Sequence, residues 1–139
     1  MAHIEMTALC DFAVRYTAAW CSNDAASVAA FYASHGSLTI NGGVPSVGTR
    51  AITDAAQGFM TAFPDLRISM DDVVQKDGEC IYHWTLEGRN TGPGGTGNCV
   101  RISGYEQWTM GDDGLISRSL GNYDAADYAR QVERGLAEP

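Results

Sequence analysis

The sequence is poor in basic residues and has no long apolar stretch. Nine Lys and Arg stand against 17 Asp and Glu, which leaves a formal net charge of −8. A surface of that sign repels nucleic-acid phosphates and anionic lipid headgroups. The fully apolar runs are only a few residues long, whereas a helix that spans a bilayer needs roughly 20 residues. We therefore expect neither a nucleic-acid partner nor a membrane partner.

Paired cysteines and metal-ligand spacings are also missing. Cys10, Cys21, Cys80 and Cys99 form no CxxC pair, so neither a zinc site nor a disulfide framework is predicted. The sequence has no HxH or HxxxH spacing and no phosphate-binding glycine loop, and we expect neither a metal nor a cofactor. No export signal opens the sequence, which, together with reduced thiols, predicts a cytoplasmic location.

The N-terminal half of the chain has the periodicity of helices. Large residues recur every three or four positions over residues 9–20, which predicts an amphipathic helix with a buried aromatic face. Asp24 offers N-cap chemistry for a short second helix that carries Tyr32 and ends at Gly36. A third helix is predicted between Thr49, which is suited to cap it, and Pro64, which ends it.

The C-terminal half is rich in β-branched and aromatic residues separated by turn sequences. Four long strands are predicted, over 66–76, 79–90, 99–110 and 115–123, after a short strand at 37–40. Residues 124–136 return to helical composition. Helices followed by a strand meander predict an α+β fold, a cone-like α+β barrel with N-terminal helices packed on a strongly curved mixed or antiparallel sheet that encloses a pocket. With 139 residues, we expect a single domain over 1–139.

Several short motifs give this order of elements a family resemblance. They are Arg15-Tyr16-Thr17-Ala18-Ala19-Trp20, Gly48-Thr49-Arg50-Ala51-Ile52, Phe63-Pro64-Asp65-Leu66, Trp84 through Gly88, and Asp113-Gly114-Leu115-Ile116. With them the chain resembles the nuclear transport factor 2-like superfamily and, within it, the SnoaL-like polyketide cyclase group, a relative of ketosteroid isomerase. The resemblance implies a small cofactor-free enzyme and a homodimer that pairs through the outer face of the sheet.

The resemblance also assigns candidate catalytic residues. Asp124 stands where SnoaL-like cyclases have the aspartate that acts as acid/base in an intramolecular aldol closure. The alternative is that Asp124 caps the final helix. Tyr16 and Glu106 fall where ketosteroid isomerase has its two hydrogen-bond donors. The general-base aspartate of that enzyme falls on Ile40, so steroid isomerase activity is not expected.

Glu106 and His83 lie on predicted strands, where alternate side chains face opposite sides of a sheet. Glu106 shares a face with Trp108. If that face is concave, Glu106 is buried, its pKa is raised and it can donate a hydrogen bond to a carbonyl. Otherwise Glu106 is exposed on the convex face. His83 and Trp84 face opposite sides, so only one of them lines the pocket, and an inward His83 would act as general base or as partner of Asp124.

Aromatic residues outline the expected ligand site. The candidate ligand-binding residues are Trp20, Phe59, Trp84, Trp108 and Asn122. Such a pocket suits a flat, mostly apolar ligand. One predicted function is acid/base proton transfer on a hydrophobic carbonyl compound, by cyclisation, isomerisation, hydration or dehydration. The alternative is a noncatalytic module of the same fold that binds a small ligand or a second copy. The first expects a perturbed carboxyl in the pocket, and the second expects no acid and base together there.

Overall fold

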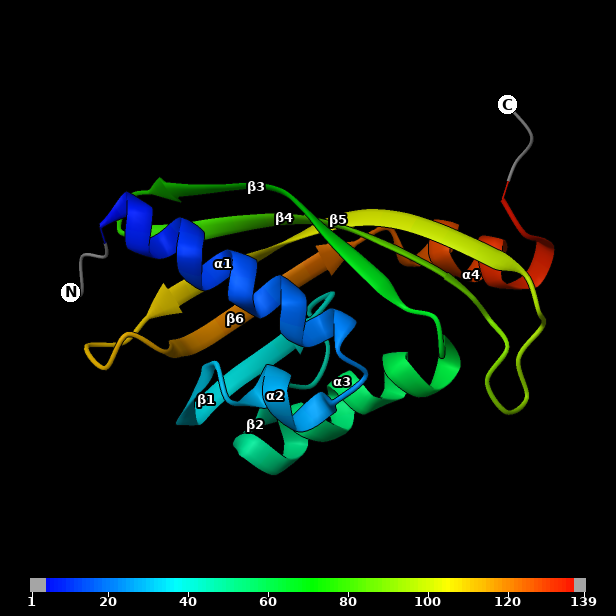
Figure 1. Cartoon of the computed structure of the whole chain (residues 1–139), viewed down its shortest axis with the longest axis horizontal. Helices are drawn as coiled ribbons and strands as arrows, with labels where there is room; N and C mark the ends of the chain where they lie inside the picture. The colour runs from blue at the N-terminus through cyan, green and yellow to red at the C-terminus, as the bar shows by residue number, and fades with distance from the viewer. Residues whose placement is uncertain (1–4, 137–139) are drawn as a thin grey trace.

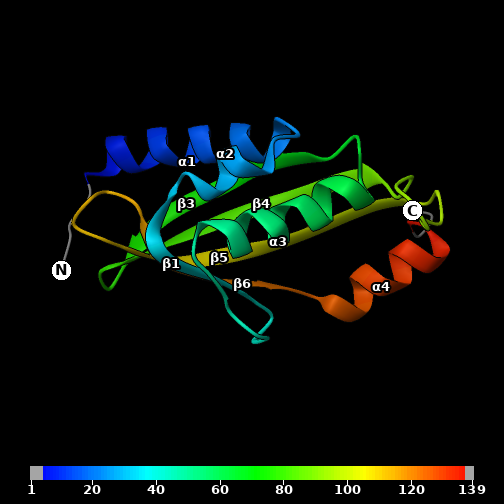
Figure 2. The same ribbon diagram turned by 90° about the horizontal axis from the view of Figure 1, so that it is seen from below.

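The computed structural model describes residues 5–136, which form four helices and six strands. In chain order they are α1 (Met6–Cys21), α2 (Ala25–Ala29), β1 (Tyr32–Ile40), β2 (Ser46–Val47), α3 (Thr49–Ala62), β3 (Arg67–Lys76), β4 (Glu79–Arg89), β5 (Cys99–Met110), β6 (Ile116–Tyr123) and α4 (Ala125–Arg134). Helices α1, α2 and α3 lie on one face of the strands, and α4 lies beyond the end of β6 (Figures 1 and 2).

The strands form one mixed sheet in the order β2-β1-β6-β5-β4-β3. Strands β3 to β6 are consecutive antiparallel neighbours, which confirms the predicted meander. Strand β1 pairs parallel with β6 and antiparallel with β2. The α+β class with helices on a mixed sheet is therefore confirmed. The sheet is not closed into a barrel, because β2 and β3 remain its two edges.

Helix α1 packs an aromatic stripe against the sheet. Phe12, Tyr16 and Trp20 are at most 8% exposed, which confirms the predicted amphipathic helix. The rings of Phe12 and Tyr16 meet the indole of Trp108 edge-on, at centroid distances of 5.6 and 5.2 Å. Each such contact contributes about 0.5–1.5 kcal/mol beyond the burial of the rings. This packing holds α1 over β5 and brings the Tyr16 hydroxyl into the interior.

The prediction of the second helix is wrong in its extent. Helix α2 ends at Ala29, and Tyr32 begins β1 instead of continuing a helix to Gly36. Strand pairing is the physical reason, since Tyr32 pairs with Ile116 and the Ile116 N–H donates to the carbonyl of Phe31. Tyr32 is 3% exposed, and a strand buries such a side chain as well as a helix does. The hydrophobic spacing over so few residues therefore could not distinguish a helix from a strand.

Helix α3 begins one residue earlier than the predicted cap at Thr49 implies. Gly48 is the N-cap and makes no side-chain cap hydrogen bond, so Thr49 is the first helical residue and not the cap. The chain enters α3 with Gly48 at φ 91°, a left-handed conformation that glycine adopts without a steric penalty. The helix ends at Ala62, just before Phe63 and Pro64, as predicted.

Candidate active site

A pocket lies between the helices and the face of the sheet that they cover. Six aromatic side chains line it, namely Trp20, Phe59, Tyr82, Trp84, Tyr123 and Tyr128. Aliphatic side chains from the strands form most of the remaining wall, and Glu106 supplies the one carboxyl of the described lining. The space outlined by these residues, including solvent at the open mouth, is about 590 Å³. Its walls suit an apolar ligand, and its single acid is placed to meet one polar group.

Strand β4 turns Tyr82, Trp84 and Leu86 toward the pocket. Because side chains alternate along a strand, His83 points to the opposite, outer face of the sheet. There its ring lies 6.1 Å from the ring of Tyr105. The alternation that the sequence left open is thereby resolved, and the sheet separates His83 from Glu106.

Glu106 lies at the closed end of the pocket and is 6% exposed, so of the two alternatives that the sequence left open the structure has the buried one. Its Oε1 accepts hydrogen bonds from Ser119 Oγ at 2.7 Å, Trp108 Nε1 at 2.9 Å, the Tyr16 hydroxyl at 3.0 Å and the Tyr32 hydroxyl at 3.2 Å. Its Oε2 lies 3.1 Å from the Tyr16 hydroxyl. These partners come from α1, β1, β5 and β6, so one carboxyl connects four elements.

The hydrogen-bond geometry has room for a proton on Glu106. Tyr16, Tyr32 and Glu106 form a triangle, since the two hydroxyl oxygens are also 2.9 Å apart. The two phenols together carry two protons, which satisfy two of the three contacts. A protonated Glu106 supplies the third. Because Oε1 already accepts from Trp108 and Ser119, a proton on this carboxyl would lie on Oε2, beside the Tyr16 hydroxyl.

Burial is the main cause of the shifted pKa values in this cluster. It raises the pKa of Glu106 above its ordinary value of 4.5, and the hydrogen bonds from Trp108, Ser119, Tyr16 and Tyr32 oppose that rise only in part. Burial, followed by the negative charge of an ionised Glu106, raises the pKa of both tyrosines well above 10. The tyrosines thus stay neutral donors, and the carboxyl keeps its proton to a higher pH than an exposed glutamic acid does.

Tyr82 forms the side of the pocket next to Glu106. Its ring stacks on the indole of Trp108 with centroids 4.9 Å apart and planes 15° apart. Its hydroxyl is hydrogen-bonded to Thr17. Thr17 Oγ1 donates its own proton to the carbonyl of Ala13 at 2.8 Å, so the Tyr82 hydroxyl is the donor in that pair. Burial raises the pKa of Tyr82, and the phenol remains neutral.

The structure brings some of the predicted site residues together and separates others. Trp20, Phe59 and Trp84 line the pocket, and Trp108 lies against Glu106 as a hydrogen-bond donor. Asp124 is exposed and caps α4, accepting a hydrogen bond from the Asp127 N–H at 3.0 Å. Asn122 lies on β6 and pairs with Tyr105 of β5, which in turn pairs with His83 of β4. Asp124, Asn122 and His83 therefore do not lie among the described pocket residues.

Sequence reasoning missed Tyr32 and Ser119, both of which contact Glu106. Tyr32 was hidden because its segment was assigned to a helix. Ser119 had a usable signal, since it alternates with Gly121 and Tyr123 along β6, and both of those residues line the pocket. The missing information was the register of β6 against β5, which places Ser119 opposite Trp108.

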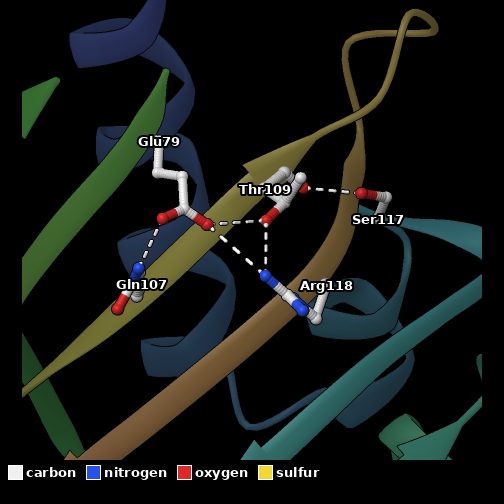
Figure 3. A network of polar contacts seen from close by, with 5 residues as sticks. All are labelled: Glu79, Gln107, Thr109, Ser117 and Arg118. Atoms are coloured by element: carbon white, nitrogen blue, oxygen red, sulfur yellow. Dashed lines mark hydrogen bonds and ion pairs between the residues drawn. The ribbon is translucent and has the colours of Figure 1, made fainter. Parts of the chain in front are cut away.

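The outer face of the sheet carries a separate polar network, drawn in Figure 3 on the side turned away from α1. The Glu79 carboxylate accepts from Gln107 Nε2 at 2.5 Å and from Thr109 Oγ1 at 3.0 Å, and it forms an ion pair with Arg118 at 3.5 Å. The hydrogen bond from Gln107 is the main cause that lowers the pKa of Glu79. This carboxylate is held ionised, in contrast to Glu106.

Within residues 5–136, no group of three or more His, Cys, Asp or Glu side chains is placed to hold a metal ion. The four cysteines are unpaired thiols. None of the described helices is both long enough and apolar enough to cross a membrane.

The SnoaL-like domain family matches residues 13–119, well over half of the sequence. The chain belongs to the SnoaL-like domain family. No curated protein matches it. The family match runs from within α1 to the middle of β6 and includes the four residues that donate to the Glu106 carboxyl.

Solved structures share the fold at low sequence identity. A candidate SnoaL-like polyketide cyclase from Jannaschia sp. CCS1 is 14% identical, with a TM-score of 0.82 over 98% of both chains. A protein with a ketosteroid isomerase-like fold from Catenulispora acidiphila DSM 44928, in complex with trimethylamine, is 10% identical, with a TM-score of 0.77 over 88% of this chain and 92% of its own. TerC, co-crystallised with polyporic acid, is 14% identical, with a TM-score of 0.71 over 89% of this chain and 97% of its own. These likenesses show the fold.

Proposed function

We propose that this chain is a small acid/base enzyme that binds a flat, hydrophobic carbonyl compound with the carbonyl oxygen at Glu106. The observation that carries the proposal is a single buried carboxyl at the closed end of an aromatic-lined pocket. The apolar walls take the rings of the ligand, and the carboxyl meets its oxygen.

Glu106 acts as the acid in this proposal. Burial favours its protonated form, and the Trp108 and Ser119 donors on Oε1 leave Oε2 as the site of that proton. In the unliganded protein the Tyr16 hydroxyl is the neighbour of Oε2. A bound carbonyl oxygen takes the place of that neighbour and receives the proton.

The proposed chemistry is interconversion of a ketone with its enol. The carbonyl oxygen accepts the Glu106 proton while the adjacent carbon–hydrogen bond breaks, its electron pair forms the carbon–carbon double bond, and its proton leaves to water. The reverse step returns a proton to carbon and the oxygen-bound proton to Glu106. An enol formed in this way can also attack an electrophilic carbon of the same ligand, which closes a ring. The proposed step assigns no role to Asp124 and His83, which lie outside the described lining.

The comparisons support a small-molecule ligand of this class. Two proteins of the same fold are described with small molecules, TerC with polyporic acid and the Catenulispora protein with trimethylamine. The Jannaschia protein is named for polyketide cyclisation, which is carbonyl chemistry. We propose for this chain a small-molecule ligand, but neither of the compounds named for those proteins.

The test is hydrogen–deuterium exchange of the protons next to the carbonyl of 1-tetralone, a two-ring aromatic ketone, followed by proton NMR in D₂O. We expect the wild type to accelerate exchange over buffer and Glu106→Gln to be slower by about 100-fold or more, since general acids contribute about 10²–10⁴-fold. Glu79→Gln, the same change on the outer face, should leave the rate unchanged. A Glu106→Gln variant that is folded and as fast as the wild type would contradict the proposal.

A second candidate function is noncatalytic binding of the same class of ligand. It is favoured by one observation, that the described lining holds one carboxyl and no histidine. Under this alternative, 1-tetralone binds with an affinity that depends on Glu106, while the wild type exchanges its protons no faster than buffer. The exchange experiment therefore separates the two candidates.

We also propose a homodimer that pairs through the outer face of the sheet, and a cytoplasmic location. The support for the dimer is the family resemblance together with the outward position of two large apolar side chains. Tyr105 is 39% exposed and Val74 is 36% exposed, and both point away from the pocket. The location rests on the composition described above.

A further inference from the structure

The open end of the pocket carries polar groups that differ from those at its closed end. Trp84, Tyr123 and Tyr128 line the pocket and are each partly exposed, whereas Glu106 and Tyr82 are 6% and 1% exposed. The pocket thus has an apolar middle between a buried acid and an aromatic mouth.

The polar atoms at the mouth are unused by the protein. Among the residues that the structure describes, the hydroxyls of Tyr123 and Tyr128 and the indole N–H of Trp84 have no hydrogen-bond partner. The phenols at the closed end, in contrast, are all engaged: Tyr16 and Tyr32 bond to Glu106, and the Tyr82 hydroxyl bonds to Thr17. Among the described phenols of the pocket, those at the mouth are therefore the ones available to a ligand.

Ring packing holds the mouth residues in place. The Tyr123 ring lies 6.0 Å from Trp84 and 5.5 Å from Tyr128, both edge-on. Tyr128 also contacts the Phe63 ring at 6.3 Å. Gly104 leaves the space that the Trp84 ring occupies, because a Cβ there would lie 2.6 Å from Trp84 Cζ2. Fixed rings present their polar atoms with little loss of side-chain entropy on binding.

Strand register places residues of the closed end and of the mouth in neighbouring rows of the sheet. Tyr82, Glu106 and Gly121 form one cross-strand row, and Trp84, Gly104 and Tyr123 form the corresponding row two residues along. Two residues of strand correspond to about 7 Å. The rows are therefore about as far apart as the two ends of a flat ligand of two fused rings, with the mouth tyrosines beyond the row of Glu106.

We propose that Tyr123 and Tyr128 form a second polar subsite, which binds a hydroxyl or carbonyl oxygen at the far end of a two-ring ligand. The inference rests on the proposed function, since it takes the near oxygen of the ligand to lie at Glu106. According to this inference, the two tyrosines at the mouth make the protein selective for ligands that carry a distal oxygen over ligands that lack one. When an apolar ligand edge covers an unpaired phenol, the phenol loses its hydrogen bond to water and gains none in return. A distal hydroxyl on the ligand replaces that hydrogen bond.

The experiment compares the dissociation constants of 1-tetralone and 6-hydroxy-1-tetralone, which differ by one hydroxyl opposite the carbonyl. The proteins are the wild type, Tyr123→Phe, Tyr128→Phe and the double variant, with Tyr105→Phe on the outer face as the matched control. We expect the wild type and the control to prefer the hydroxylated ketone by about five-fold or more. The double variant should lose that preference and bind 1-tetralone within about two-fold of the wild type.

The outcomes separate this inference from the function on which it rests. A wild type without preference, a preference that survives in the double variant, or failure of both ketones to bind would overturn the second subsite. Titration of Glu106→Gln with 1-tetralone tests the near end independently. A tyrosine-dependent preference together with unchanged binding to Glu106→Gln would retain the mouth subsite and reject Glu106 as the near contact.

Discussion

Two glutamates on the same sheet illustrate how single residues acquire opposite electrostatic behaviour. Glu106 faces the pocket, where burial raises its pKa above 4.5. Glu79 lies on the outer face, where hydrogen bonds from Gln107 and Thr109 lower its pKa. The difference arises from the face of the strand that each residue occupies, since both are glutamates on neighbouring strands.

This contrast predicts the pH dependence of stability. Because the pKa of Glu106 is higher in the folded state, its contribution is complete below about pH 4.5 and is lost as pH rises through the folded pKa. Replacement by Gln removes this loss, so the stability of Glu106→Gln relative to the wild type should increase with pH over that window. The slope is at most about 1.4 kcal/mol per pH unit. Urea unfolding at a series of pH values measures it.

Glu79→Gln serves as the control of opposite sign. The pKa of Glu79 is lowered by folding, so its contribution is present above the unfolded pKa and is lost as pH falls. The stability of Glu79→Gln relative to the wild type should therefore increase toward low pH. A Glu106→Gln profile that runs parallel to that of the wild type would contradict the raised pKa.

At the scale of secondary-structure elements, α4 is the helix that brings Tyr128 to the pocket. Gln131, 4% exposed, accepts a hydrogen bond from the Arg101 N–H at 2.7 Å, which joins α4 to β5. The Val132 carbonyl accepts from Asn98 Nδ2 at 2.9 Å. Asp124 caps the first turn of the helix. The position of Tyr128 thus depends on contacts at both ends of α4.

Asp124 offers a test of capping against catalysis. Asn is as good an N-cap as Asp, whereas Ala is a poor one. We expect Asp124→Ala to lower the free energy of unfolding by about 1 kcal/mol. Asp124→Asn should leave the free energy of unfolding unchanged and keep the exchange rate of 1-tetralone within about two-fold of the wild type. A large loss of exchange in a fully stable Asp124→Asn would instead support the acid/base role that the family resemblance implies for this residue.

At the scale of the whole molecule, the sheet separates two surfaces with different chemistry. One face holds the helices and the pocket, as Figure 2 shows for the helices. The other carries the Glu79 network and the exposed ring of Tyr105. A second copy that docked on the outer face would leave the pocket mouth open, because α4, which carries Tyr128, lies beyond the end of β6 (Figure 1).

The proposed homodimer predicts twice the 14.9 kDa mass of the chain in solution. Placing a charge at the centre of the outer face, by Tyr105→Arg, should shift the protein to the monomer, since a buried unpaired charge is costly. Tyr105→Phe should leave the assembly unchanged. Sedimentation equilibrium measures both, and a wild type that is monomeric at high protein concentration would contradict the dimer.

Much of the fold could be predicted from the sequence because its signals are local. The turn sequence at Asp77-Gly78 separates β3 from β4, and both strands were placed within one residue of their bounds. The aromatic stripe of α1 was likewise predictable from spacing alone. The segment around Tyr32 was not, because its strand conformation depends on pairing with β6, more than 80 residues away in the sequence.

The local pattern of residues determines the helices, the meander and the fact that Glu106 and Trp108 share a face. Strand alternation sorts residues into two sets but does not say which set is buried, since that depends on where the helices pack. Tertiary packing placed Glu106 inside and His83 outside, left Asp124 as an exposed cap, and brought Tyr16, Tyr32 and Ser119 to one carboxyl. Convergence of residues so distant in the chain is a property of the folded sheet, and it creates the acid that we propose as the centre of function.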